Sequence, residues 1–128
     1  MIKVLPVSEL QALCVEAERN GIALSDLDSI RSKFGVSPEA ILNEVALTVA
    51  QGYATGALSY EFCDDVMNGI ANAIVDLGRV GELPQPAFSL YQAFDEGEWH
   101  RNSDSPEDDP GEKYTRPLVL EILSDLER

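Results

Sequence analysis

The sequence has little positive charge. Nine lysines and arginines stand against 23 aspartates and glutamates, which gives a formal net charge of −14. Binding to nucleic acids or to anionic membranes requires a basic surface, so this charge argues against both kinds of partner. The same charge favours fast association with a basic protein, although it also serves solubility alone.

Residues suited to catalysis are scarce. His100 is the only histidine, and no serine or cysteine lies in a nucleophile-elbow sequence such as G-x-S-x-G. The chain has no G-x-x-x-x-G-K-[ST] phosphate loop and no G-x-G-x-x-G after a strand. These absences argue against a hydrolytic or nucleotide-dependent enzyme.

Cysteines and long apolar runs are also rare. Cys14 and Cys63 both fall in helical patterns, which predicts buried free thiols in a cytoplasmic protein. No apolar run approaches the roughly 20 residues that a membrane-spanning helix requires. The N-terminal "MIKVLPVSELQALC" has neither a long apolar region nor an A-x-A-like cleavage site, so no signal peptide is expected.

What the chain does contain is a series of helix signals. With 128 residues, of which 45% are hydrophobic, it is expected to form one helical domain over residues 1–128. Helix starts are indicated at Ser8 with Gln11, Ser25 with Asp28, Ser37-Pro38-Glu39, and Ser59. The first three helices are expected to end near Gly21, Gly35 and Gly52.

The fourth predicted helix is the longest. Its apolar residues Phe62, Val66, Ile70, Ala73 and Leu77 recur every three or four positions, which is typical of a central helix, and Gly78 is expected to end it. Further helices are predicted over about 86–95 and 116–127, and only "IKVLPV" suits a short strand. The predicted fold is all-α, a single irregular bundle of five or six helices with a long acidic loop before the C-terminal helix.

The predicted loop lies in "FDEGEWHRNSDSPEDDPGEKYTRP", from Phe94 to Pro117. Its prolines and glycines favour turns over a helix. We expect the aromatic residues Phe94, Trp99 and Tyr114 to fix its two ends to the bundle, leaving residues 104–109 as an exposed acidic crest. The loop is then either a shaped negative surface for a positive partner or a mobile acidic linker.

A metal site is a further interpretation of the carboxylates. The loop breaks the EF-hand pattern, because Gly97 comes too early and Trp99 and His100 occupy positions that need a ligand and a glycine. On the long helix, Glu61 and Asp65, and Asp64 and Asn68, are spaced to share a cation. Helical di-metal sites usually add an E-x-x-H motif, which this chain lacks, so no metal ligand and no cofactor is predicted.

Asp64 and Asp65 also mark a second acidic surface. No lysine or arginine lies between Lys33 and Arg79 to offset them. Like charges four positions apart, such as Glu61 and Asp65, weaken a helix slightly. The face is therefore either a solvated polar surface or a binding surface.

Two fragments, "TGALSYEFCDDVMNGI" and "LYQAFDEGEWHRNSDSPEDDPGEKYTRPLVLEIL", resemble a family of small acidic bacterial proteins similar to helical immunity proteins. The shared features are D-D-x-x-N at Asp64–Asn68, F-D-x-G-E at Phe94–Glu98 and Y-T-x-P at Tyr114–Pro117. They cover roughly the second half of the chain. The resemblance implies a cognate toxin, often a basic nuclease, and offers no catalytic residue to carry over.

These observations lead to one functional expectation and two alternatives. The chain is expected to be a non-enzymatic, cytoplasmic immunity protein that binds a cognate basic toxin domain through its acidic surface. The alternatives are a helical adaptor or secretion chaperone, and a metal-dependent enzyme or metal sensor. The predicted partner-binding residues are Asp64, Asp65, Asp95, Glu96, Glu98, Asp104, Glu107, Asp108, Asp109 and Glu112.

Overall fold

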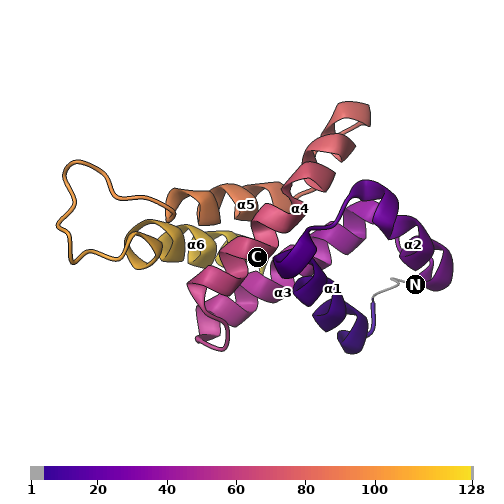
Figure 1. The fold of residues 1–128 in the computed structure, drawn as a ribbon, viewed down its shortest axis with the longest axis horizontal. Coiled ribbons are helices and arrows are strands. Elements are labelled where there is room, and N and C mark those ends of the chain that lie inside the picture. The colour runs from indigo at the N-terminus through magenta and orange to yellow at the C-terminus, as the bar shows by residue number, and fades with distance from the viewer. Residues whose placement is uncertain (1–4, 128) are drawn as a thin grey trace.

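The computed structural model describes residues 5–127, and all its regular elements are helical (Figure 1). This confirms the all-α prediction of five or six packed helices. The elements are α1 (Val7–Asn20), the 3₁₀ turn η1 (Leu24–Leu27), α2 (Asp28–Phe34), α3 (Pro38–Thr55), α4 (Tyr60–Val80), α5 (Ala87–Glu96), the π-helical turn η2 (Gly111–Thr115) and α6 (Arg116–Leu126).

Two of the predicted helix starts are confirmed in atomic detail. Ser37 Oγ accepts a hydrogen bond from the Ala40 N–H at 3.2 Å, and Ser59 Oγ accepts one from the Phe62 N–H, also at 3.2 Å. These side chains occupy the position at which an oxygen can satisfy an otherwise unpaired N–H of the first turn. They fix the beginnings of the two long helices, α3 and α4.

The other two predicted starts are wrong. Helix α1 begins at Val7, after Pro6, with no side-chain cap, so Ser8 lies inside the helix. Ser25 lies inside η1, where Asp26 instead accepts the Ala23 N–H at 2.9 Å. A serine caps a helix only if its own backbone is non-helical and the residues after it are helical. A short sequence pattern does not determine these backbone angles.

The long helices extend past the glycines expected to end them. Helix α3 continues beyond Gly52 to Thr55 and ends before Gly56, whose φ of 82° is the left-handed conformation that glycine adopts without strain. Helix α4 continues beyond Gly78 to Val80. The predicted strand segment "IKVLPV" lies partly outside the described residues, and its last residue, Val7, is helical.

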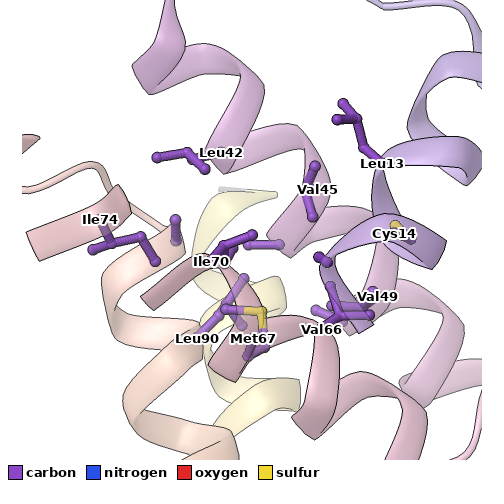
Figure 2. Close-up of a cluster of buried hydrophobic side chains, with 14 of the residues drawn as sticks. Leu13, Cys14, Leu42, Val45, Val49, Val66, Met67, Ile70, Ile74 and Leu90 are labelled. Carbon is purple, nitrogen blue, oxygen red and sulfur yellow. The ribbon is translucent and has the colours of Figure 1, made fainter. Parts of the chain in front are cut away.

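The core lies around α4, as its apolar spacing predicted. Val66, Met67, Ile70 and Ile74 are fully buried and pack with side chains from α1, α3 and α5 (Figure 2). Phe62 and Leu77, at the ends of the predicted stripe, are only partly buried. None of the helices within residues 5–127 is long and apolar enough to cross a membrane.

Helices α1 and α4 approach each other very closely. A Cβ on Gly69 of α4 would collide with the backbone carbonyl of Ala17 in α1. Just after α1, the Ile22 N–H donates to the Gly69 carbonyl at 2.8 Å. The absence of a side chain at Gly69 therefore allows α1 to lie across the central helix.

Both cysteines are buried and free, as predicted. Burial raises the pKa of the Cys14 thiol to about 11 and that of the Cys63 thiol to about 12. The Cys63 thiol donates to the Val49 carbonyl at 3.4 Å. Neither sulfur has the lowered pKa that marks a reactive thiol.

Candidate functional site: an acidic cluster on α4 and α5

The acidic loop is shorter than the sequence suggested. Its predicted ends are helical, because Phe94–Glu96 belong to α5 and Gly111–Thr115 form η2, which leads into α6. The irregular part, residues 97–110, extends beyond the ends of α5 and α6 at the opposite end of the molecule from α2 (Figure 1).

Three side-chain hydroxyl groups hold the two ends of this loop against the bundle. Tyr60 OH donates to the Phe94 carbonyl at 2.6 Å, and Thr115 Oγ1 donates to the Ala93 carbonyl at 2.7 Å. Tyr53 OH donates to the Gly111 carbonyl at 3.1 Å. These bonds tie side-chain hydroxyl groups of α3, α4 and η2 to backbone carbonyls at the C-terminal end of α5 and at the start of η2.

Two glycines make this close approach possible. A Cβ on Gly97 would collide with Thr115 Oγ1 and would lie only 2.9 Å from Gly111 Cα and from the Tyr60 hydroxyl. A Cβ on Gly111 would lie 3.1 Å from the Tyr60 ring. The loop therefore leaves and rejoins the bundle at one crowded point beside the ring of Tyr60.

Asp104 organises the interior of the loop, contrary to the expectation that it is exposed. Its side chain is fully buried and accepts hydrogen bonds from the Arg101 N–H at 2.8 Å, Lys113 Nζ at 2.6 Å and Tyr114 OH at 2.5 Å. The Arg101 amide, Lys113 and Tyr114 hold the pKa of Asp104 well below its usual range. An exposed crest over residues 104–109 is thus wrong for Asp104, whose charge is used inside the loop.

A stacked arginine is the second feature of the loop. The Arg101 guanidinium lies 4.0 Å from the centre of the Trp99 ring and 3.6 Å from that of Tyr114. It also pairs with Glu96 at 2.6 Å and donates to the Trp99 carbonyl at 2.9 Å. Trp99 itself is 55% exposed, so the expectation that it anchors the loop to the bundle is wrong.

The other predicted loop carboxylates also have partners within the chain. Glu112 pairs with Arg116 at 2.6 Å, and Asp108 pairs with Lys113 at 3.3 Å. Asp109 accepts the Gly111 N–H at 2.9 Å, and Glu107 accepts the Ser105 hydroxyl. Together with Glu96 and Asp104, these residues stabilise the loop's own structure, although Glu107 and Asp109 remain exposed.

The structure brings the remaining four predicted residues together in one place. Asp64 and Asp65 lie on α4, Asp95 lies in the last turn of α5, and Glu98 follows α5. We call Asp64, Asp65, Asp95 and Glu98 the acidic cluster. Asn68 joins its two halves, because its Nδ2 donates to Glu98 Oε2 at 2.9 Å and to Asp64 Oδ2 at 3.4 Å.

Within residues 5–127, the acidic cluster has no ion-pair partner. Asp64 is half-buried, and its Oδ1 is a buried oxygen without a hydrogen-bond partner in the described part of the chain. Asp65, Asp95 and Glu98 are exposed. The cluster therefore presents uncompensated negative charge to solvent, with one carboxylate set partly beneath the surface.

The crowding of these carboxylates changes their protonation. Burial, hydrogen bonding to Glu98 and the charges of Glu98, Asp65 and Asp95 raise the pKa of Asp64 to about 8. The pKa of Asp95 is raised by burial and by Glu98. Asp64 consequently keeps its proton near neutral pH, because burial and the neighbouring negative charges disfavour its ionised form.

The cluster is unfavourable for the free protein. Asp95 lies in the last turn of α5, where the helix dipole is negative and a basic residue would be stabilising. Repulsion among the carboxylates adds to this cost. A positive charge placed over the cluster would remove both penalties, so the geometry suits the binding of a cationic group.

No group of three or more histidine, cysteine, aspartate or glutamate side chains in residues 5–127 is arranged to hold a metal ion. The only histidine is engaged elsewhere, because His100 Nε2 donates to the Asp108 carbonyl at 2.7 Å.

Sequence reasoning missed the residues that shape this region. Tyr53, Tyr60 and Thr115 hold the ends of the loop, and Arg101 organises its aromatic side chains. A partial signal was present, since buried tyrosines on apolar helix faces need a partner for the hydroxyl group. Nothing in the pattern indicated that the partner of Tyr60 is a carbonyl 34 positions away.

Comparisons with known proteins do not extend these findings. No protein-family model, no curated protein and no solved structure matches the chain.

Proposed function

We propose that the protein is a non-enzymatic, cytoplasmic immunity protein that binds and neutralises a basic toxin domain through the acidic cluster. The observation that carries the proposal is the convergence of Asp64, Asp65, Asp95 and Glu98, which no cation among residues 5–127 pairs with. A protein that kept these residues for folding alone would gain stability by losing them. Their cost is explained if a positively charged partner completes the surface.

The division of the carboxylates supports a specific contact. The carboxylates of the loop form hydrogen bonds and ion pairs with other loop residues. The loop therefore has a defined shape next to the cluster. The cluster contributes the unsatisfied charge. A basic active site or substrate-binding groove of a toxin offers the complementary potential, and its occlusion would neutralise the toxin.

Binding through the cluster carries a proton signature. A cation close to Asp64 lowers its pKa from about 8, so association near neutral pH releases a proton. Calorimetry in two buffers of different ionisation enthalpy, with the product of the adjacent gene as partner, would measure this release. A binding reaction without proton release would show that the partner contacts another surface.

A second candidate function, a helical adaptor or secretion chaperone, is favoured by a groove between α5 and α6. Two adjoining hollows of about 380 and 390 Å³ share Ser89 and Ile122. Leu118 and Leu126 contribute exposed apolar surface to them. This groove would hold an apolar partner segment, and such binding would be insensitive to salt, unlike binding through the acidic cluster.

A further inference from the structure

The only tryptophan of the chain is exposed although it is held in place. Trp99 is 55% exposed, and one face of its indole is covered by the Arg101 guanidinium at 4.0 Å. Arg101 is itself fixed, because it pairs with Glu96 and donates to the Glu96 and Trp99 carbonyls at 2.6 and 2.9 Å. The ring is thus pre-organised, which lowers the entropy lost when a partner contacts it.

The surroundings of Trp99 select for a cation. Its preceding neighbour, Glu98, belongs to the acidic cluster, which has no cation of its own within residues 5–127. An indole face attracts a guanidinium, and a carboxylate accepts the guanidinium's hydrogen bonds. The chain already contains such an arrangement, because the Arg101 guanidinium stacks on the Trp99 indole and pairs with the Glu96 carboxylate.

We propose that the exposed face of Trp99, together with Glu98, binds an arginine side chain of the partner protein. The inference rests on the proposed function and specifies its central contact. The partner's guanidinium stacks on the indole on the side away from Arg101 and pairs with the Glu98 carboxylate. Arginine is preferred over lysine because its planar guanidinium stacks on aromatic faces and forms paired hydrogen bonds.

Short peptides test this contact without a known partner. The full chain is titrated with acetylated, amidated Gly-Arg-Gly-Arg-Gly and with the matched lysine and citrulline peptides. Nuclear magnetic resonance follows the single indole N–H signal, which reports on Trp99 alone. We expect the arginine peptide to shift this signal and to bind about two- to five-fold more tightly than the lysine peptide. The neutral citrulline peptide should not bind.

Variants assign the preference to the indole. Trp99→Leu should remove the preference for arginine over lysine, as followed by the backbone amide of Glu98, while weak charge-dependent binding remains. Glu98→Gln should weaken the binding of the arginine peptide, although the peptide should still shift the indole N–H signal. If Trp99→Leu fails to fold, the comparison of the three peptides on the wild-type chain still tests the preference for arginine.

Two results would overturn the inference. In one, arginine and lysine peptides bind equally, shifting the amides of the acidic cluster but leaving the indole signal unmoved; the proposed function would then stand without the Trp99 contact. In the other, no peptide changes the indole signal up to about 10 mM, a concentration at which even a weak site is occupied. Failure of the proposed function is detected separately, by the absence of any binding of a basic protein partner.

Discussion

Replacing Asp64 by asparagine should stabilise the free protein, and the gain should grow with pH. Asparagine keeps the shape of the side chain and removes a charge that its neighbours oppose. The folded-state pKa of Asp64, about 8, exceeds its ordinary value of 3.8. The folded protein therefore binds the proton more tightly than the unfolded chain, and the wild type loses stability as the pH rises from about 4 to about 8.

The size of the gain follows from these values. The pKa difference is about 4, and each pKa unit corresponds to about 1.36 kcal/mol, which sets an upper bound near 6 kcal/mol at high pH. Asp65, Asp95 and Glu98 are exposed, so solvent screens much of the repulsion. We expect Asp64→Asn to raise the free energy of unfolding by about 1–3 kcal/mol at pH 9 and by under about 1 kcal/mol at pH 5.

Urea denaturation followed by circular dichroism at several pH values measures the free energy of unfolding at pH 5 and at pH 9. Glu61→Gln is the matched control, since it removes one exposed charge from the same helix outside the acidic cluster. It should change stability by less than about 0.5 kcal/mol at every pH. A destabilising effect of Asp64→Asn at pH 9, or an equal effect at pH 5 and pH 9, would show that the neighbouring carboxylates do not oppose the charge of Asp64.

Three further predictions concern the fold. Ile70→Ala should cost about 2–5 kcal/mol in urea denaturation because Ile70 is fully buried, and a loss under about 1 kcal/mol would contradict its place in the core. Gly97→Ala should cost about 1–3 kcal/mol, since the added methyl group collides with Thr115; an unchanged denaturation midpoint would show that the loop has room there. Reduction should leave the melting temperature unchanged because Cys14 and Cys63 are free, whereas a clear fall in reducing buffer would indicate a disulfide.

The sequence was informative where local rules decide the structure. The Ser37-Pro38 and Ser59 starts were predictable because a cap and its N–H lie within four residues. The buried face of α4 was predictable because helical spacing alone places Val66, Ile70 and Ala73 on one side. The helix ends were less so, because the glycines in α3 and α4 remain helical when packing against neighbouring helices is favourable.

The candidate site required the three-dimensional structure. All ten carboxylates were predicted as a single class. In the structure, six are held by ion pairs or hydrogen bonds in and beside the loop, whereas the four of the acidic cluster form no ion pair within residues 5–127. Asp104 lies close to Tyr114 and Lys113 only because the loop turns back on itself. Glu98 meets Asn68 across 30 positions of sequence. Charge counts predict a negative surface, whereas the folded chain determines which negative charges are left for a partner.

The most direct test of the proposed function measures association with the co-expressed product of the adjacent gene. Two variants remove equal charge: Asp65→Asn/Asp95→Asn/Glu98→Gln in the acidic cluster, and Glu39→Gln/Glu82→Gln/Glu121→Gln on exposed positions outside both the cluster and the loop. We expect the first variant to slow association about ten-fold or more and to flatten its salt dependence, while the second stays within about three-fold of the wild type. Equal association rates and equal salt dependence for the two variants would contradict the proposed function.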